Sequence, residues 1–270
     1  MTAIVSLKDA AFSYGETEIF GGISLDVSAG EIVCILGANG CGKTTLLRCI
    51  NSSLRLKKGK IYVGEDDIAT LSVDKVALKI GFVFQEHSAP FPFSVLEVVR
   101  MGRAPHMKIL ATPSKKDTAI AEESLALVGM LHLKNKPYTQ ISGGERQLIL
   151  IARTLAQNPE VILMDEPTSH LDFRNQTIIL QMICKLAEKG IAVIMTSHLP
   201  DHALLYSSRV ALMKDGGFLA VGKPDEVMTE ESLKNIYGIE VKMVTVNDPN
   251  SHGTIKIVLP MKELTNHNKN

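Results

Sequence analysis

Short apolar runs alternate along this chain with longer segments in which apolar residues recur every three or four positions. Four runs, EIVCIL, KIGFVFQ, VILMDE and IAVIMTSH, have the length and continuous apolar character of strands buried on both faces. Helical periodicity marks KTTLLRCINSSL, ERQLILIARTLAQ and NQTIILQMICKLAEKG, the last of which stops at Gly190. Strands that alternate with helices in this way predict an α/β domain built on a mostly parallel sheet.

The segments around this alternation have other patterns. AIVSLKDAAFSY and GISLDVS indicate antiparallel strands, with turn signals at Gly15 and at 21–22. The middle, 88–136, is first rich in proline and aromatic residues and then helical in SKKDTAIAEESLALVGM, which predicts a helical subdomain inserted into the sheet domain. Near the C-terminus the chain predicts a helix, KPDEVMTEESLKNIYG, and then a hairpin that turns at 248–250.

The four buried runs share a feature at their carboxyl ends. Polar or glycine residues follow there: Gly37, Gln85, the pair Asp165 and Glu166, and His198. Ligands of open α/β sheets bind just outside the carboxyl ends of the strands. Because parallel strands end at the same edge of a sheet, the four ends predict one shared ligand site. Together they are stronger evidence than any one of them alone.

Composition limits the classes of partner. Lys plus Arg and Asp plus Glu number 29 each, so the formal net charge is zero and no basic patch suggests nucleic acid. The four cysteines show neither a CxxC pair nor metal-ligand spacing, which is typical of reduced thiols in a cytoplasmic protein. The N-terminus has no signal-peptide pattern, and the apolar stretches fall short of the ~18 residues that span a bilayer. We therefore expect any membrane role to depend on a partner.

GANGCGKT, from Gly37 to Thr44, matches the phosphate-binding pattern G-x-x-x-x-G-K-[ST] in full. Its glycines let backbone N–H groups curl around phosphate oxygens, and the helix that begins there adds its positive end. Lys43 supplies a charge for the β- and γ-phosphates, and Thr44 supplies a hydroxyl for Mg²⁺. The strand before the motif and the helix after it favour a nucleotide-binding loop over a chance glycine-rich turn.

VILMDEP adds two carboxylates at the end of a buried strand. Asp165 suits Mg²⁺, directly or from a second shell, because this ion prefers oxygen ligands. Glu166 is placed to polarise an attacking water as a general base. His198 and Gln85 each leave two interpretations open. His198 contacts the γ-phosphate or the water, or is structural, and Gln85 is a site residue or a surface amide.

ISGGERQLILIARTL opens another helix with Ser142, Gly143 and Gly144. A hydroxyl and bare N–H groups at a helix start form a second anion-binding site. The first loop already holds the phosphates of one triphosphate, so the second site needs an explanation of its own.

The order of the Gly37–Thr44 loop, Gln85, ISGGERQ, VILMDEP, SHLD and His198 resembles that of the ATP-binding cassette (ABC) ATPases over nearly the entire chain. The resemblance implies a P-loop NTPase fold of the RecA-like type, with an N-terminal antiparallel β subdomain and an inserted α-helical subdomain. It also implies a head-to-tail pair of chains, in which each ATP lies between the phosphate loop of one copy and the helix start at Ser142 of the other. ATP and Mg²⁺ are then the cofactors.

We expect one ABC ATPase domain over 1–270. The nucleotide-binding core comprises 1–87 and 155–240, the helical subdomain with the signature motif 88–154, the C-terminal hairpin 241–262 and the tail 263–270.

The resemblance implies a role for each matching residue, beginning with Tyr14, which would stack on adenine. The catalytic residues would be Glu166 as base, His198 as γ-phosphate sensor, and Gln85, which also links the metal to the transport partner. The metal site would comprise Thr44, Gln85 and Asp165. The nucleotide-binding loop would comprise Gly37, Ala38, Asn39, Gly40, Cys41, Gly42, Lys43, Thr44 and Thr45. The signature residues facing the other copy's ATP would be Ser142, Gly143, Gly144 and Glu145. The dimer seam would comprise Ser169, His170, Leu171 and Asp172.

Two functions of different classes follow from the resemblance. One is the ATPase subunit of a membrane transporter, and the other is a soluble ABC ATPase of DNA repair or translation. Soluble relatives of the second class usually carry two cassettes or long coiled-coil inserts. The single cassette, the lack of sustained heptads and the lack of a basic patch favour the transporter.

The implied transporter is an importer, and Glu145 in the signature is also found in importer members. HSAPFPFSVLEVVRMGRAPH and the C-terminal hairpin are similar to importers for iron–siderophore, haem and cobalamin, with a molybdate or tungstate branch. The implied partners are a second copy, separate transmembrane permease subunits and, indirectly, an extracytoplasmic substrate-binding protein. The chain would lie peripherally on the cytoplasmic face of the membrane. Phe91, Phe93, Val95 and Leu96 would line the docking groove or else pack the helical subdomain.

Overall fold

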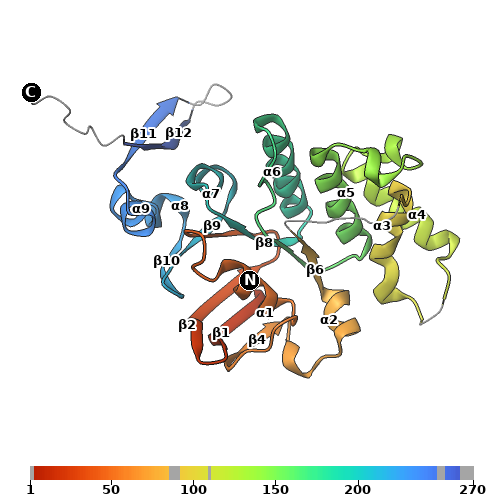
Figure 1. Ribbon diagram of the computed structural model, residues 1–270, viewed down its shortest axis with the longest axis horizontal. Coiled ribbons are helices and arrows are strands. Elements are labelled where there is room, and N and C mark those ends of the chain that lie inside the picture. Colours follow the sequence, from red (N-terminus) through yellow and green to blue (C-terminus); the bar gives the residue numbers. More distant parts are fainter. Residues whose placement is uncertain (1–2, 85–91, 109–110, 248–252, 262–270) are drawn as a thin grey trace, which may run out of the picture.

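The computed structural model describes residues 3–84, 92–108, 111–247 and 253–261. A six-stranded sheet lies at the centre of this part of the chain (Figure 1). Its strands are β3 (Ile32–Leu36), β6 (Ile80–Val83), β7 (Val161–Met164), β8 (Ala192–Ser197), β9 (Arg209–Lys214) and β10 (Gly217–Gly222). They follow the order β10-β9-β3-β8-β7-β6, in which every pair is parallel except β10 with β9. The predicted mostly parallel α/β core is therefore confirmed.

An antiparallel sheet from the N-terminal region covers one side of the core. Its strands are β1 (Ala3–Tyr14), β2 (Thr17–Ser28), β4 (Lys58–Val63) and β5 (Asp66–Asp67), in the order β2-β1-β4-β5. The turn predicted at Gly21 and Gly22 is wrong, because β2 continues through both residues. The register against β1 shifts there, and Gly22 adopts φ 65°, so the two glycines form a β-bulge rather than a turn.

Alternate side chains of β3 enter two different hydrophobic cores. Cys34 and Leu36 pack in one core with α6 (Phe173–Glu188). Ile35 packs in the other with the antiparallel sheet and α1 (Lys43–Ile50). All five residues of β3 are buried, which confirms the prediction of a strand covered on both faces. The loop that leaves β3 is thereby anchored in the interior of the protein.

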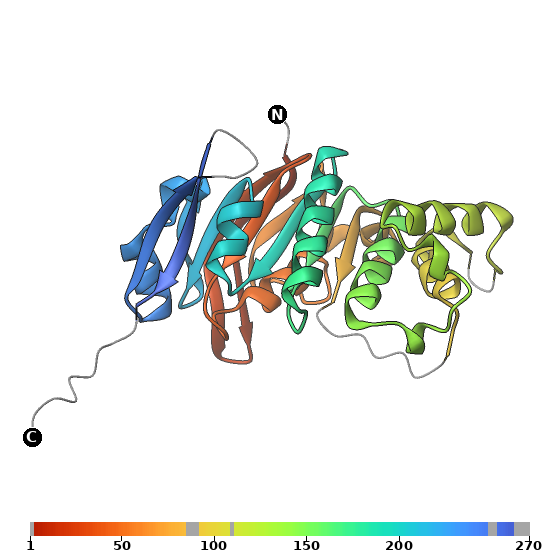
Figure 2. The ribbon, with the colours of Figure 1, turned by 90° about the horizontal axis from the view of Figure 1, so that it is seen from above.

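A helical subdomain lies at one end of the molecule (Figures 1 and 2). Its helices are α3 (Val95–Arg100), η2 (Met101–His106), α4 (Lys115–Leu127), η3 (Leu131–Leu133), η4 (Tyr138–Gln140) and α5 (Gly143–Ala156). η1 (Ile68–Thr70) and α2 (Val73–Lys79) precede it. Three of its helices begin with reciprocal capping boxes, at Ser94, Ser114 and Ser142.

The C-terminal elements lie at the opposite end from the helical subdomain (Figure 2). They are α8 (Pro224–Val227), α9 (Glu230–Tyr237), β11 (Val241–Asn247) and β12 (Thr254–Pro260), and α7 (Pro200–Tyr206) lies between them and α6. The single helix predicted over 223–238 is wrong. Thr229 is extended and its side chain accepts a hydrogen bond from the Ser232 N–H, so a new helix begins there. The hairpin is confirmed, while its turn at 248–250 and the tail 263–270 lie outside the described residues.

Among the helices of the described residues, none is both long and apolar enough to cross a membrane.

Candidate nucleotide-binding and hydrolysis site

The loop between β3 and α1 has the backbone that phosphate binding requires. A Cβ on Gly37 would lie 2.4 Å from the carbonyl oxygen of Met213, so only glycine fits. Gly42 adopts φ 106° directly before α1, which few other residues tolerate. The Lys43 side chain is 5% exposed and folds back over the loop, where its Nζ donates to the carbonyl oxygens of Gly37 (2.8 Å) and Ala38 (3.0 Å). The lysine thus lies where it can exchange these carbonyl contacts for phosphate oxygens.

A cavity of about 420 Å³ opens over this loop. The residues that line it include Asn39, Gly40, Gly42, Lys43, Thr44, Thr45 and Glu166. Lys43 Nζ lies 3.8 Å from Glu166 Oε1. The structure therefore brings the predicted phosphate loop and the predicted base into one cavity, although they are more than a hundred residues apart.

Thr44 and Asp165 meet at the edge of this cavity. Thr44 Oγ1 donates to Asp165 Oδ1 at 3.1 Å, and Asp165 is 5% exposed. A hydroxyl beside a carboxylate suits Mg²⁺, which binds one or two protein oxygens and completes its shell with phosphate and water. Within the described ranges, no cluster of three His, Cys, Asp or Glu residues could hold a metal alone. The residues present thus fit a Mg²⁺ ion that arrives with a nucleotide.

Thr196, on β8, is a site residue that the sequence patterns did not single out. Its hydroxyl donates to Asp165 Oδ1 at 2.8 Å and accepts from the Glu166 N–H at 2.9 Å, and the residue is fully buried. One hydroxyl therefore orients the predicted metal ligand and the backbone of the predicted base. A polar residue within the apolar run IAVIMTSH, next to its carboxyl end, was the available signal.

Replacing Thr196 by valine tests this role, because the two side chains have nearly the same shape. We expect Thr196→Val to lower the free energy of unfolding by about 1–3 kcal/mol, since a buried carboxylate loses a donor. We also expect kcat to fall about tenfold as the carboxylates lose their orientation. Thr154→Val is the matched control: its hydroxyl is buried and donates to the Leu150 carbonyl in α5. Chemical denaturation and ATPase assays measure both effects, and equal kcat losses in the two variants would contradict the assignment.

Glu166 and His198 come together at the ends of β7 and β8. His198 Nδ1 lies 3.2 Å from Glu166 Oε2, in an alignment that is not that of a hydrogen bond. Glu166 adopts φ 45°, a left-handed conformation that is costly for a residue with a Cβ and typical of functional sites. The contact places His198 beside the predicted base.

The predicted dimer-seam residues adjoin this pair. Ser169 and His170 line a cavity of about 440 Å³ together with Glu166 and His198. Leu171 packs against the main core, and the Asp172 side chain caps α6 by accepting from a backbone N–H at 2.8 Å. The exposed part of this segment thus opens directly onto the site.

The signature residues lie elsewhere in the chain. Ser142 caps α5, and Glu145 returns the contact by accepting from the Ser142 N–H at 2.7 Å. This bond, with the contact to the Ser142 hydroxyl, lowers the pKa of the Glu145 carboxyl. Ser142 and Gly143 are exposed, while Gly144 packs so closely on Asn175 that a Cβ would lie 2.5 Å from it. β8 and β7 separate β3 from β6, against which α5 packs, so the two predicted anion sites do not meet within one chain.

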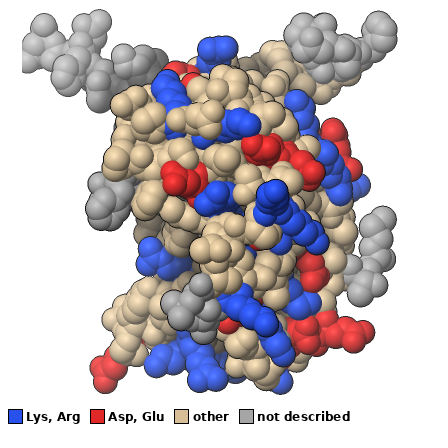
Figure 3. All heavy atoms as spheres, turned by 90° about the vertical axis from the view of Figure 1, so that its right-hand side faces the viewer, with Lys and Arg blue, Asp and Glu red and all other residues tan. Residues whose placement is uncertain are grey.

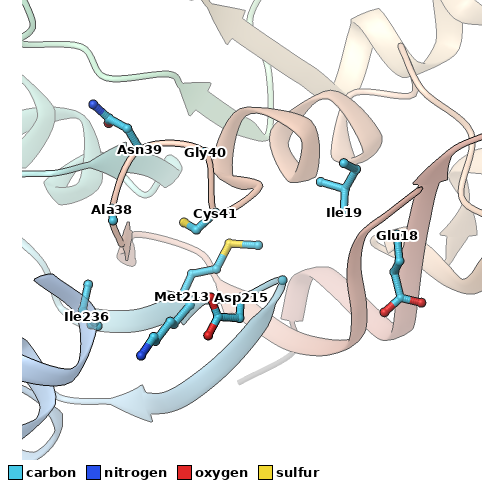
Figure 4. A pocket seen from close by; sticks show the side chains of 11 residues that line it. Glu18, Ile19, Ala38, Asn39, Gly40, Cys41, Met213, Asp215 and Ile236 are labelled. Atoms are coloured by element: carbon cyan, nitrogen blue, oxygen red, sulfur yellow. The ribbon is translucent and has the colours of Figure 1, made fainter. Parts of the chain in front are cut away.

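Three further predicted residues have distinct positions. Tyr14 is 48% exposed at the end of β1, with its ring edge-on to Phe12 at 4.8 Å. The Cys41 side chain faces a separate cavity of about 460 Å³ behind the loop, beside Met213 (Figure 4). Burial raises the pKa of the Cys41 thiol. Gln85 lies outside the described residues.

The fold and this site define a P-loop nucleotide hydrolase. The family model described as ABC transporter matches residues 20–169, and the chain belongs to that family. ATP-binding subunits of this family are ATPases coupled to transport.

Named relatives and a solved structure match almost the whole chain. It is 36% identical to the molybdate import ATP-binding protein MolC of Haemophilus influenzae, over 88% of this chain and 89% of that protein. It is 31% identical to the hemin import ATP-binding protein HmuV of Thermobifida fusca, over 97% of this chain and 90% of that protein. A structure of a metal-chelate type ABC transporter in an inward-facing conformation matches with a TM-score of 0.86 and 33% identity, covering 97% of this chain and 98% of that one. The resemblance inferred from the sequence motifs is confirmed.

Proposed function

We propose that this chain is the ATP-hydrolysing subunit of an ABC importer that takes up a metal chelate. An iron–siderophore or haem is the first candidate substrate. The similarity to a hemin import protein and to a metal-chelate type transporter supports this substrate class. Similarity to MolC keeps molybdate or tungstate as the second candidate, and cobalamin as a third. The observation that carries the ATPase role is the convergence of Lys43, Thr44 and Glu166 at one cavity. Asp165 accepts a hydrogen bond from Thr44 at its edge.

Each of the site residues that the structure describes then has a role in binding or hydrolysing ATP. Lys43 binds the β- and γ-phosphates, and backbone N–H groups of the loop surround their oxygens. Mg²⁺, held through Thr44 and Asp165, would neutralise phosphate charge. Glu166 accepts a proton from the attacking water, and His198 contacts the γ-phosphate. Tyr14 stacks on adenine from its exposed position.

A second copy completes the site. The loop cavity is open, and the Ser142 helix start is exposed on another part of the same chain. Head-to-tail pairing would place that helix start against the γ-phosphate in the other copy's loop, with Ser169 and His170 at the seam. ATP then closes the pair because the γ-phosphate gains contacts from both copies, and hydrolysis releases it.

Membrane subunits would dock on a groove of about 470 Å³ between α2, α3 and η2. Phe93 and Met101 line it and are 39% and 45% exposed. Val95 is fully buried and Leu96 packs against the core, so these two pack the helical subdomain and do not line a surface groove. Phe91 lies outside the described residues.

Charged side chains of both signs surround the apolar part of this groove. Asp74, Glu97, Arg100 and Lys108 also line it, so an amphipathic helix with charges at its rim would fit. Figure 3 views the molecule from this end and shows basic and acidic side chains intermingled among other residues. Docking here would hold the chain peripherally on the cytoplasmic side of the membrane.

Met101→Asp should abolish co-purification with the membrane subunits, because it places a charge in the apolar groove, while basal ATPase activity of the isolated chain stays unchanged. Leu127→Asp is the matched control, since Leu127 is 46% exposed at the end of α4 in the same subdomain. Co-purification with the cognate permease and ATPase assays of the isolated chain check both variants. Equal binding of both variants to the permease would contradict the docking site.

The assembled importer tests the substrate class. Reconstituted in vesicles with its permease and binding protein, it should hydrolyse ATP faster when a ferric siderophore or haem is added. Stimulation by molybdate alone would select the second candidate. If no permease binds and activity responds instead to DNA or ribosomes, the chain belongs with the soluble ABC ATPases.

A further inference from the structure

The C-terminal helix α9 contacts the loop that carries His198. The Tyr237 hydroxyl, at the last residue of α9, donates to the carbonyl oxygen of His198 at 3.0 Å. Its ring is partly buried and packs against the main core. Burial, and then the nearby Cys34 and Cys41 thiols, raise the pKa of the Tyr237 phenol. The phenol therefore keeps its proton and remains a donor at neutral pH.

The same loop is held a second time, from the hairpin. The Val258 N–H of β12 donates to Asp201 Oδ1 at 2.9 Å, in the first turn of α7. Within the loop, the Leu199 N–H donates to Ser197 Oγ at 3.0 Å. The segment from His198 to Asp201 is thus tied at both ends to elements that follow β10. These elements lie beyond the family match, which ends at residue 169.

These two bonds matter because the His198 side chain is not fixed by a hydrogen bond at Nδ1. It is 41% exposed, and its 3.2 Å approach to Glu166 is not a hydrogen bond. The direction of the imidazole therefore depends on the backbone of its own residue, which Tyr237 fixes at the carbonyl. Small displacements of a catalytic group cost large factors in rate.

We propose that Tyr237 is a positioning residue for hydrolysis: its hydroxyl holds the His198 backbone so that the imidazole faces the γ-phosphate. This inference rests on the sensor role given to His198 in the proposed function. It makes α9 and the hairpin part of the hydrolysis machinery. The neighbouring Ile236 lines the cavity behind the phosphate loop (Figure 4). Helix α9 therefore borders both the loop and, through Tyr237, the sensor.

Tyr237→Phe removes only the donor. In the full-length protein we expect kcat to fall about threefold to tenfold, because one hydrogen bond and the alignment that it provides are lost. The dissociation constant for ATP should stay unchanged, because the phosphate loop dominates binding. Tyr206→Phe is the matched control: Tyr206 packs against the same core at the end of α7. If Tyr237→Phe leaves kcat unchanged, or Tyr206→Phe lowers it equally, the proposal is overturned.

A double-mutant cycle with His198→Ala separates positioning from general packing. Hydrolysis is measured under single-turnover conditions, because these allow the rates of slow variants to be determined. If Tyr237 acts through His198, adding Tyr237→Phe to His198→Ala changes the rate by less than about twofold. A loss equal to that of the single variant would show that Tyr237 acts by another route. If His198→Ala alone turns over at the normal rate, the sensor role fails, and the inference fails with it; a slow His198→Ala with additive losses overturns only the role of Tyr237.

Discussion

Glu166→Gln should bind ATP but hydrolyse it on the order of 10²–10⁴ times more slowly than the unaltered chain, the factor expected for loss of a general base. The amide keeps the shape of the side chain but cannot accept the proton of the attacking water. It also removes the negative charge 3.8 Å from Lys43 Nζ, so ATP binding should be retained or tightened. With ATP bound and not consumed, the chain should accumulate as a closed pair.

Nucleotide binding, hydrolysis and size-exclusion chromatography with ATP measure these three properties. Glu188→Gln is the control, because Glu188 is exposed at the end of α6 and is remote from the site. Normal hydrolysis by Glu166→Gln would remove Glu166 from the role of base. Loss of ATP binding would instead indicate that this carboxylate organises the phosphate loop.

The local pattern of the sequence predicts most of the site's backbone. Continuous apolar runs predict that β3, β7 and β8 are buried strands, and the carboxyl ends of parallel strands lie at one edge of the sheet. For this reason the residues after three distant runs, Lys43, Glu166 and His198, could be expected to meet. In the structure Glu166 lies 3.8 Å from Lys43 Nζ and 3.2 Å from His198 Nδ1.

Features that depend on long-range contacts were not predictable in this way. Gly21 and Gly22 have the composition of a turn, and only pairing with β1 makes them a bulge. Thr196 looks like one more residue of a buried strand until Asp165 and Glu166 meet its hydroxyl. The bond from Tyr237 to the His198 carbonyl joins residues 39 apart, and no periodicity encodes it.

Ser142→Arg should leave ATP binding by a single chain intact and strongly weaken pairing. Ser142 is exposed and distant from the phosphate loop in its own chain, so its replacement does not touch the bound nucleotide there. In the pair, a bulky cation would occupy the place where the other copy's γ-phosphate meets the start of α5. We expect pairing to weaken on the order of 10²-fold, as for loss of a central interface residue.

Ser142 is also a helix cap, so its replacement can weaken pairing by destabilising α5. A second capping serine provides the control for this effect. Ser142→Arg also removes a cap, at a cost of about 1 kcal/mol to α5. Ser114 has the same reciprocal capping box with Asp117 at the start of α4. Ser114→Arg should therefore show a similar loss of stability and still pair with ATP. If both variants fail to pair, damage to the helical subdomain is the cause rather than the shared site.

A mixing experiment decides whether the two anion sites serve different copies. Lys43→Ala has a disabled phosphate loop and an intact Ser142, and Ser142→Arg has the reverse. In a head-to-tail pair of the two variants, one site combines an intact loop with an intact helix start. Differently labelled chains should therefore associate with ATP only when the two variants are mixed, as measured by energy transfer. If Ser142→Arg chains pair with each other as readily as unaltered chains do, the shared site is refuted.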